Sequence, residues 1–332
     1  MVKNKILIVE DEKITAMDLK FKLEDLNYEI CGMAVNGVDA INLANKEKPD
    51  LVLMDITLKG EMNGINAAKS ILNENIPLIF LTSHTDEDTF KEANQVPSYG
   101  FLNKPFDMLK LERTIKLALN RSKIELDKLQ MSKGETSILA TQNPKLHEQA
   151  VIEFEAGKKY KNEFLTKRKA NNTFTVLIIE DESITALDLK AKIEDFGYNV
   201  LGIEDNGEKA IELAKDKKPD LILMDISLKG SISGIDVSKQ ISHLNIPIVY
   251  LTGSSNDENI KNALETAPYG FISKPIFDLE LEQILELTLI KHTDDFEKIF
   301  GTEISQTPDS QSTNKSKKEP KFKSLIRGIL KK

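Results

Sequence analysis

The chain has 332 residues, of which 40% are hydrophobic and 30% are charged, and its formal net charge is −8. This balance excludes a largely disordered chain. No apolar run approaches the ~20 residues that span a bilayer, and the N-terminus lacks the apolar stretch of a secretion signal. A single cysteine, Cys31, excludes an intrachain disulfide and fits a reducing compartment. We therefore expect a cytoplasmic protein, and the negative net charge argues against nucleic acid as a partner.

An internal repeat organises the chain. The segment Ile6–Lys20, ILIVEDEKITAMDLK, returns 170 positions later as VLIIEDESITALDLK, and KPDLVLMDITLKG returns at the same offset as KPDLILMDISLKG. About half of the aligned positions are identical. Copies this long are duplicated domains rather than units of a solenoid. The expected parts are a first domain at 3–120, a charged and partly helical linker at 121–172, a second domain at 173–292, and a polar, then basic amphipathic tail at 293–332.

Strands and helices are predicted to alternate five times in each copy. In the first copy, short apolar runs predict strands at 5–9, 29–33, 51–54, 78–81 and 100–103. Apolar positions three or four residues apart predict helices at 14–26, 36–45, 64–72, 86–95 and 106–119. This alternation predicts an α/β fold, with two copies of a doubly wound five-stranded parallel sheet that has helices on both faces.

Polar side chains follow the predicted strands at their carboxyl ends, where open parallel sheets bind their ligands. In the first copy these residues are Glu10, Asp11, Asp55, Thr82 and Lys104. In the second copy they are Glu180, Asp181, Asp225, Thr252 and Lys274. Each site is therefore expected to collect three carboxylates, one hydroxyl and one ammonium group. A single aspartate after a strand is more often a helix cap, so the prediction depends on the whole set recurring in order.

The chemistry of this set points to phosphoryl transfer. Three neighbouring carboxylates repel one another, and a divalent cation relieves that repulsion. Hard oxygen ligands with room for water suit Mg²⁺. A carboxylate beside a metal ion and a lysine is a reasonable nucleophile toward phosphorus, because phosphoryl transfer needs mainly positioning and charge neutralisation.

Each copy resembles a response-regulator receiver domain, a CheY-like domain with a flavodoxin-like fold, from its first strand to its last helix. The resemblance implies that Asp55 and Asp225 accept phosphoryl groups, which Thr82, Thr252, Lys104 and Lys274 would contact. It also implies a Mg²⁺ site in each copy. The implied ligands are Glu10 (through water), Asp11, Asp55 and the carbonyl of Thr57 in the first copy, and Glu180, Asp181, Asp225 and the carbonyl of Ser227 in the second.

The resemblance further implies an aromatic switch residue three positions before each lysine. Phe101 and Phe271 occupy these positions, although a plain core role for both rings remains open. A cis peptide bond is common in the family between the lysine and the proline that follows it, which here is Lys104-Pro105 or Lys274-Pro275. X-Pro bonds adopt the cis form at low cost.

We therefore expect a two-component response regulator with tandem receiver domains and no recognisable output domain. A sensor histidine kinase would load both aspartates, and phosphorylation would change contacts with an unknown downstream protein. The chain is expected to be a phosphoacceptor rather than an enzyme, with possible self-catalysed phosphorylation and dephosphorylation. One alternative is a phosphorelay intermediate or phosphate sink. A nucleotide-binding enzyme is disfavoured because no glycine-rich loop follows either first strand.

The second alternative is a membrane-surface adaptor that uses the tail. Its last segment, KSKKEPKFKSLIRGILKK, is basic, and its apolar residues fall three or four apart. Such a helix can make weak contact with an anionic membrane surface. A solubilising tail is the simpler interpretation. In the linker, His147 is expected to be solvated.

Overall fold

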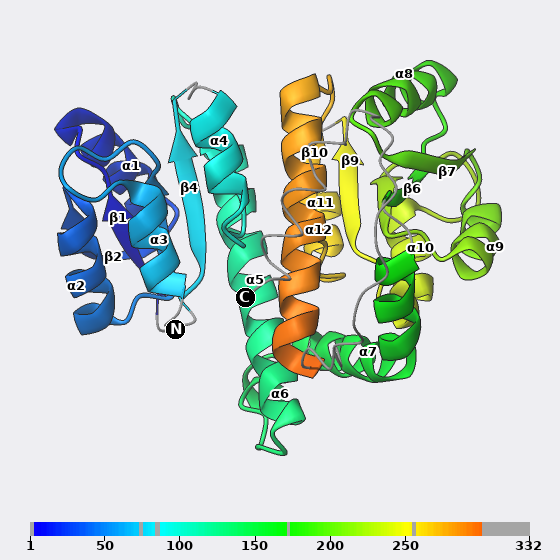
Figure 1. Ribbon diagram of the computed structural model, residues 1–332, viewed down its shortest axis with the longest axis horizontal. Helices are drawn as coiled ribbons and strands as arrows, with labels where there is room; N and C mark the ends of the chain where they lie inside the picture. The colour runs from blue at the N-terminus through cyan, green and yellow to red at the C-terminus, as the bar shows by residue number, and fades with distance from the viewer. Residues whose placement is uncertain (1–2, 73–75, 84–86, 171–172, 254–256, 301–332) are drawn as a thin grey trace, which may run out of the picture.

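The computed structural model describes residues 3–72, 76–83, 87–170, 173–253 and 257–300. Two α/β domains lie on opposite sides of the molecule, and the long helices α5 and α12 lie side by side between them (Figure 1). The predicted fold class is confirmed in both copies.

The first domain alternates strand and helix as predicted. Its elements are β1 (Lys5–Val9), α1 (Lys13–Asp25), β2 (Glu29–Ala34), α2 (Gly37–Glu47), β3 (Leu51–Asp55), α3 (Gly64–Leu72), β4 (Leu78–Thr82), α4 (Glu87–Asn94), β5 (Phe101–Asn103) and α5 (Met108–Ser132). The strands are parallel and lie in the order β2-β1-β3-β4-β5.

The second domain repeats this arrangement. Its elements are β6 (Thr175–Ile179), α8 (Ser183–Asp195), β7 (Asn199–Glu204), α9 (Gly207–Lys217), β8 (Leu221–Asp225), α10 (Gly234–Ile241), η1 (Ser242–Leu244), β9 (Ile248–Thr252), α11 (Asp257–Leu264), β10 (Gly270–Ser273) and α12 (Asp278–Phe300). The strand order is β10-β9-β8-β6-β7. In each sheet the last strand, β5 or β10, is therefore an edge strand.

The continuous apolar strands are buried on both faces of each sheet. Along β1, Leu7 and Val9 belong to the apolar cluster on one face, whereas Ile6 and Ile8 belong to the cluster on the other. This follows from the two-residue period of a strand. Burying each such side chain contributes roughly 1.5–3 kcal/mol relative to exposure, so the central strands hold the site at their ends firmly.

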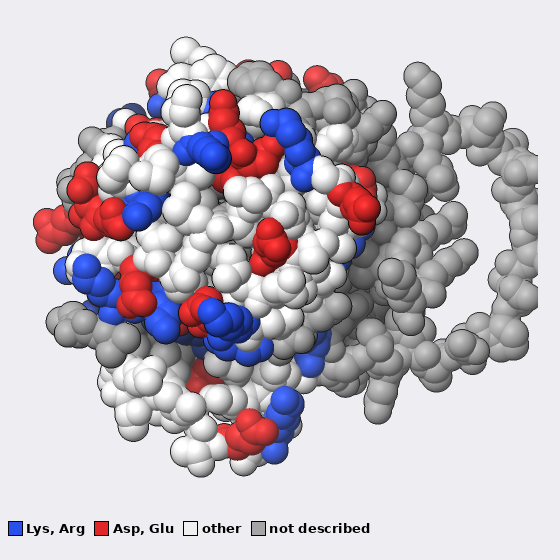
Figure 2. Space-filling model, turned by 90° about the vertical axis from the view of Figure 1, so that its left-hand side faces the viewer, with Lys and Arg blue, Asp and Glu red and all other residues white. Residues whose placement is uncertain are grey.

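Helix α1 has two apolar stripes, and only one of them packs against the sheet. Ala16, Leu19 and Leu23 are buried. Ile14 and Phe21, in contrast, are 82% and 58% exposed. The side of the molecule formed by this domain carries acidic and basic residues interspersed around uncharged surface (Figure 2). Apolar side chains on α1 are thus available to a partner.

The segment predicted as a partly helical linker at 121–172 is mostly helical and packs against both domains. α5 continues to Ser132, and α6 (Leu139–Gln142) and α7 (Pro144–Ala170) follow. α7 contacts α5 of the first domain and both η1 and α12 of the second. His147, which was expected to be solvated, is only partly exposed, and its Nδ1 lies 2.6 Å from the buried carboxylate of Asp127.

The predicted boundary between the second domain and the tail, at 292/293, falls within α12. α12 continues to Phe300, and Asp295 and Phe296 are buried. The helix continues because these side chains pack against neighbouring elements. The basic end of the tail lies outside the described residues. Among the described helices, none combines the length and hydropathy needed to cross a membrane.

Candidate phosphoacceptor sites

In each domain, the central strand ends at an aspartate that faces the acidic pair after the first strand. Asp55 is the last residue of β3, and β1 lies beside β3 in the sheet. The chain then turns into α3, whose first residue, Gly64, approaches the strand end closely. A Cβ at Gly64 would lie 1.8 Å from the carbonyl oxygen of Asp55. The glycine therefore lets the helix begin directly beside the candidate acceptor.

In the first domain, Lys104 joins two carboxylates. Its Nζ lies 2.5 Å from Oε2 of Glu10 and 2.9 Å from Oδ2 of Asp55. The backbone N–H of Thr57 donates to Oδ1 of Asp55 at 3.1 Å. Glu10 and Asp55 are each only 2% exposed. Both oxygens of the candidate acceptor are thus oriented by donors from two different loops.

The second domain reproduces this geometry. Nζ of Lys274 lies 2.7 Å from Oε2 of Glu180 and 2.5 Å from Oδ2 of Asp225. The backbone N–H of Ser227 donates to Oδ1 of Asp225 at 2.8 Å. The duplicated sequence has therefore kept the same arrangement twice.

The charges of each site shift the pKa values of its buried members. Burial raises the pKa of Glu10 above its ordinary value, and the nearby charge of Asp55 adds to this, although Lys104 opposes it. Burial by itself lowers the pKa of Lys104, but the two carboxylates outweigh it, so the net shift is upward. In the second domain, the pKa values of Glu180 and Lys274 are raised for the same reasons. The single buried ammonium group in each site therefore compensates only part of the negative charge of the neighbouring carboxylates.

The donor set fits a hard divalent cation. Glu10, Asp11 and Asp55 each offer a carboxylate oxygen, and these atoms lie within 4.8 Å of one another, as do those of Glu180, Asp181 and Asp225. Carboxylate oxygens alone are the ligands that Mg²⁺ prefers, with water completing its shell. Receiver domains in general bind Mg²⁺ in such an acidic pocket. Asp11 also pairs with Lys59 at 2.8 Å.

The predicted threonines lie beside the lysines. Thr82 ends β4 and is buried. Its carbonyl oxygen accepts a hydrogen bond from the backbone N–H of Lys104 at 2.8 Å, and Thr252 and Lys274 make the equivalent bond. Both Lys-Pro peptide bonds are cis, as the resemblance implied.

The two candidate switch rings sit on the edge strands β5 and β10. Phe101 stacks on Phe80, with ring centroids 5.5 Å apart. Phe271 stacks on Tyr250 at 5.7 Å. Both phenylalanines are only partly buried, and both line a cavity that residues of the two domains share.

Sequence reasoning missed two lysines at the rim of the sites. Lys59 pairs with Asp11, and Lys229 pairs with Asp181 at 3.1 Å. Both lysines are largely exposed, which allows them to move away. The signal was present in the repeat, because both copies carry Leu-Lys-Gly at this point.

Comparison with known families agrees with the fold. The family model described as response regulator receiver domain matches residues 6–116 and 176–286. These matches cover roughly two thirds of the chain. The chain belongs to the response regulator receiver domain family and contains two tandem copies of that domain. Receiver domains of this family belong to two-component, or phosphorelay, signal transduction.

The two relatives described next each match a length of about one receiver domain. The transcriptional regulatory protein PdtaR of Mycobacterium tuberculosis is 38% identical over 121 residues, which is 36% of this chain and 58% of PdtaR. Sporulation initiation phosphotransferase F of Bacillus subtilis is 32% identical over 35% of this chain and 94% of its own length. Among solved structures, the signal receiver domain of a modulated diguanylate cyclase from Desulfovibrio desulfuricans is 37% identical, covering 37% of this chain and 99% of that chain, with a TM-score of 0.37. This chain thus spans little more than half of PdtaR.

Proposed function

We propose that Asp55 and Asp225 are both phosphoacceptors, loaded by a sensor histidine kinase, and that the protein signals through phosphorylation-dependent contacts. The observation that carries this proposal is the complete set of groups around each aspartate. Each acceptor has a lysine at 2.5–2.9 Å and two further carboxylates at the same sheet edge.

The proposed transfer needs one bond to form and one to break. A carboxylate oxygen of Asp55 attacks phosphorus, the bond from phosphorus to the donor breaks, and its electron pair leaves with the donor. Lys104 neutralises charge that develops on the phosphoryl oxygens, and the N–H of Thr57 holds the carboxylate in place. We propose that Glu10, Asp11, Asp55 and the carbonyl of Thr57 hold Mg²⁺, which would neutralise further phosphoryl charge. In the second copy, Glu180, Asp181, Asp225 and the carbonyl of Ser227 would do the same, beside Lys274. Thr82 and Thr252 would contact the phosphoryl group through their hydroxyls.

The exposed stripe of α1 supports docking of a protein donor beside the site. α1 begins two residues after Asp11, and Ile14 in its first turn is 82% exposed. In the second domain, Ile184 and Leu187 of α8 are 80% and 62% exposed. Exposed apolar residues that recur in both copies next to the acceptor fit a shared partner class. We infer that this partner is the kinase.

Intact mass spectrometry tests the proposal. Wild-type protein treated with acetyl phosphate and Mg²⁺ is expected to gain up to two phosphoryl groups. Asp55→Asn and Asp225→Asn are each expected to lose one addition, and the double variant both. A wild-type protein that gains no phosphoryl group, or a double variant that still gains two, would contradict the proposal. Asp50→Asn is the matched control, because Asp50 directly precedes β3 at the end of that strand opposite to Asp55.

A further inference from the structure

The two domains contact each other through equivalent faces. Nζ of Lys110, near the start of α5, lies 2.8 Å from Oε1 of Glu280, which occupies the same position of the repeat near the start of α12. Further along, Lys291 of α12 pairs with Glu125 of α5 at 2.7 Å. The two helices therefore run side by side in the same direction, as expected for a contact with approximate two-fold symmetry.

The centre of this contact repeats the same pairing in both directions. The guanidinium of Arg121 in the first domain lies over the ring of Tyr269 at 4.0 Å. The ammonium group of Lys291 in the second domain lies over the ring of Tyr99 at 4.4 Å. Arg121 and Lys291 are equivalent positions of the repeat, and so are the two tyrosines. The duplicated faces are thus complementary to each other.

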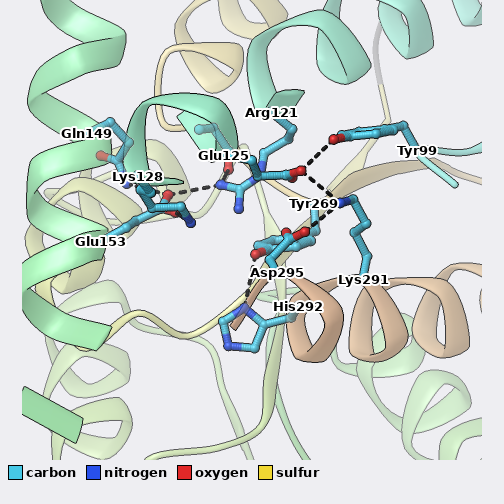
Figure 3. A network of polar contacts seen from close by, with 11 residues as sticks. Tyr99, Arg121, Glu125, Lys128, Gln149, Glu153, Tyr269, Lys291, His292 and Asp295 are labelled. Carbon is cyan, nitrogen blue, oxygen red and sulfur yellow. Dashed lines mark hydrogen bonds and ion pairs between the residues drawn. The ribbon is translucent and has the colours of Figure 1, made fainter. Parts of the chain in front are cut away.

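The contact buries a network of basic and acidic side chains (Figure 3). Arg121, Lys128 and Lys291 supply three positive charges, and their side chains are at most 8% exposed. Three carboxylates face them: Glu125, Asp295 and Glu153. Since an uncompensated buried charge is strongly unfavourable, separating the faces or shifting one against the other is costly.

Helix α7, which belongs to the linker, contributes Glu153 to this network. Oε1 of Glu153 accepts from Arg121 at 2.9 Å and Oε2 from Lys128 at 2.8 Å. Arg121 also donates to the carbonyl oxygen of Ala267, in the loop before β10, at 3.0 Å. One arginine thus joins the first domain, the linker and the second domain.

The acceptor sites are connected to this interface through the edge strands. Tyr99 lies two residues before β5, and Lys104 directly after its last residue. Tyr269 and Lys274 bracket β10 in the same way. Phe101 and Phe271 line one cavity of about 80 Å³ between the domains, together with Lys110 and Glu280. In addition, the guanidinium of Arg113 of α5 lies 5.7 Å from the ring centroid of Phe271.

We propose that the two receivers are energetically coupled through this internal interface, so that phosphorylation of either aspartate promotes phosphorylation of the other. The inference rests on the proposed function of both aspartates. In the structure the two domains are in contact while Lys104 and Lys274 are each paired with carboxylates of their own acceptor site. A phosphoryl group offers the lysine new acceptor oxygens, and the resulting shift at Lys104 or Lys274 strains a strand of three or four residues that leads to the interface. Once phosphorylation of one receiver has weakened the contacts between the domains, phosphorylation of the other receiver has fewer intact contacts to disrupt.

Coupling of this kind is reciprocal for binding equilibria. Its size for two linked sites is typically about fivefold or more. We therefore expect the fraction of doubly phosphorylated wild-type protein to exceed, by about fivefold or more at low loading, the product of the occupancies measured in Asp55→Asn and Asp225→Asn. Intact mass at several acetyl phosphate concentrations gives all of these fractions.

A charge exchange at the rim of the interface tests the route. Lys110→Glu places two carboxylates opposite each other and is expected to remove the excess of doubly phosphorylated protein. Adding Glu280→Lys restores an ion pair and is expected to restore that excess. Lys110 is 38% exposed, so the variant should fold. The control is Lys20→Glu, because Lys20 pairs within α1 with Glu24, far from the interface.

The outcomes separate this proposal from the one on which it rests. Wild-type protein that gains no phosphoryl group contradicts the proposed function itself. Two phosphoryl groups that load independently, with the doubly phosphorylated fraction equal to the product of the single occupancies, contradict the coupling alone. An excess that survives in Lys110→Glu, or that the Glu280→Lys exchange fails to restore, contradicts the interface as its route.

Discussion

Replacing Glu125 by glutamine is expected to change how the stability of the protein depends on pH. Burial raises the pKa of Glu125 to about 7, and the neighbouring charge of Asp295 adds to this, although Lys291 and Arg121 oppose it. Glutamine has nearly the same shape and keeps an oxygen that can accept from the hydroxyl of Tyr99, the donor to Glu125 in the structure.

The sign of the effect follows from proton linkage. In the unfolded chain Glu125 loses its proton near its ordinary pKa of 4.5, whereas in the folded protein it keeps the proton to about pH 7. Between these values unfolding releases a proton, so this group lowers the free energy of unfolding as pH rises. Each pKa unit corresponds to about 1.4 kcal/mol, which gives a loss of roughly 3 kcal/mol at most.

The Glu125→Gln variant does not undergo this pH-dependent fall in the free energy of unfolding. It also gives up part of two hydrogen bonds, at a cost of about 1–2 kcal/mol at every pH. We therefore expect the stability of Glu125→Gln relative to wild type to rise by roughly 2–3 kcal/mol between pH 5 and pH 8. Urea unfolding followed by circular dichroism at four pH values measures this difference.

The control for this measurement is Glu112→Gln, on the same helix, whose carboxylate pairs with Lys116 and is 34% exposed. Its stability relative to wild type is expected to vary far less with pH. A difference for Glu125→Gln that stays constant, or that falls as pH rises, would refute the reasoning about the buried carboxylate.

Further predictions concern the acceptor site of the first domain. Gly64→Ala is expected to destabilise the protein by about 3 kcal/mol or more, because the new Cβ would lie 1.8 Å from the carbonyl oxygen of Asp55; a thermal midpoint equal to that of wild type would contradict this. Lys104→Met is expected to slow phosphorylation of Asp55 by roughly 10²-fold, through loss of charge neutralisation, and an unchanged rate by intact mass would count against that role. Wild-type protein is expected to gain about 1.4 kcal/mol of stability per site at ten times the Kd for Mg²⁺, whereas Asp11→Asn should lose the gain from the first site, and an equal gain in both would rule out Asp11 as a ligand. Ile14→Asp is expected to slow transfer to Asp55 from a phosphorylated kinase but not from acetyl phosphate, and equal slowing with both donors would exclude a docking role.

The candidate sites could be predicted from sequence because their residues sit at the ends of continuous apolar strands. Leu51–Met54 is buried on both faces, which fixes it as a central strand and places Asp55 at the carboxyl edge of the sheet. The order of the other polar residues, repeated in the second copy, then requires them to meet at that edge.

The linker and the end of the second domain could not be predicted in this way. The pattern of their charged residues predicts a solvated surface, yet Arg121, Lys128 and Lys291 are buried. A polar side chain can be buried when a partner of opposite charge reaches it from another element, and here Glu153 comes from α7 and Glu125 from α5. The sequence of one helix does not contain its partner, so its pattern alone cannot distinguish a buried ion pair from exposed charge.

By itself, the sequence determined two receiver folds and the composition of both acidic sites, because strand burial and strand-end position are local properties of each copy. The tertiary structure decided that the two copies face each other through α5 and α12, that α7 closes their contact, and that both candidate switch rings border the same cavity. These features depend on complementarity between surfaces far apart in the chain, which no single segment specifies.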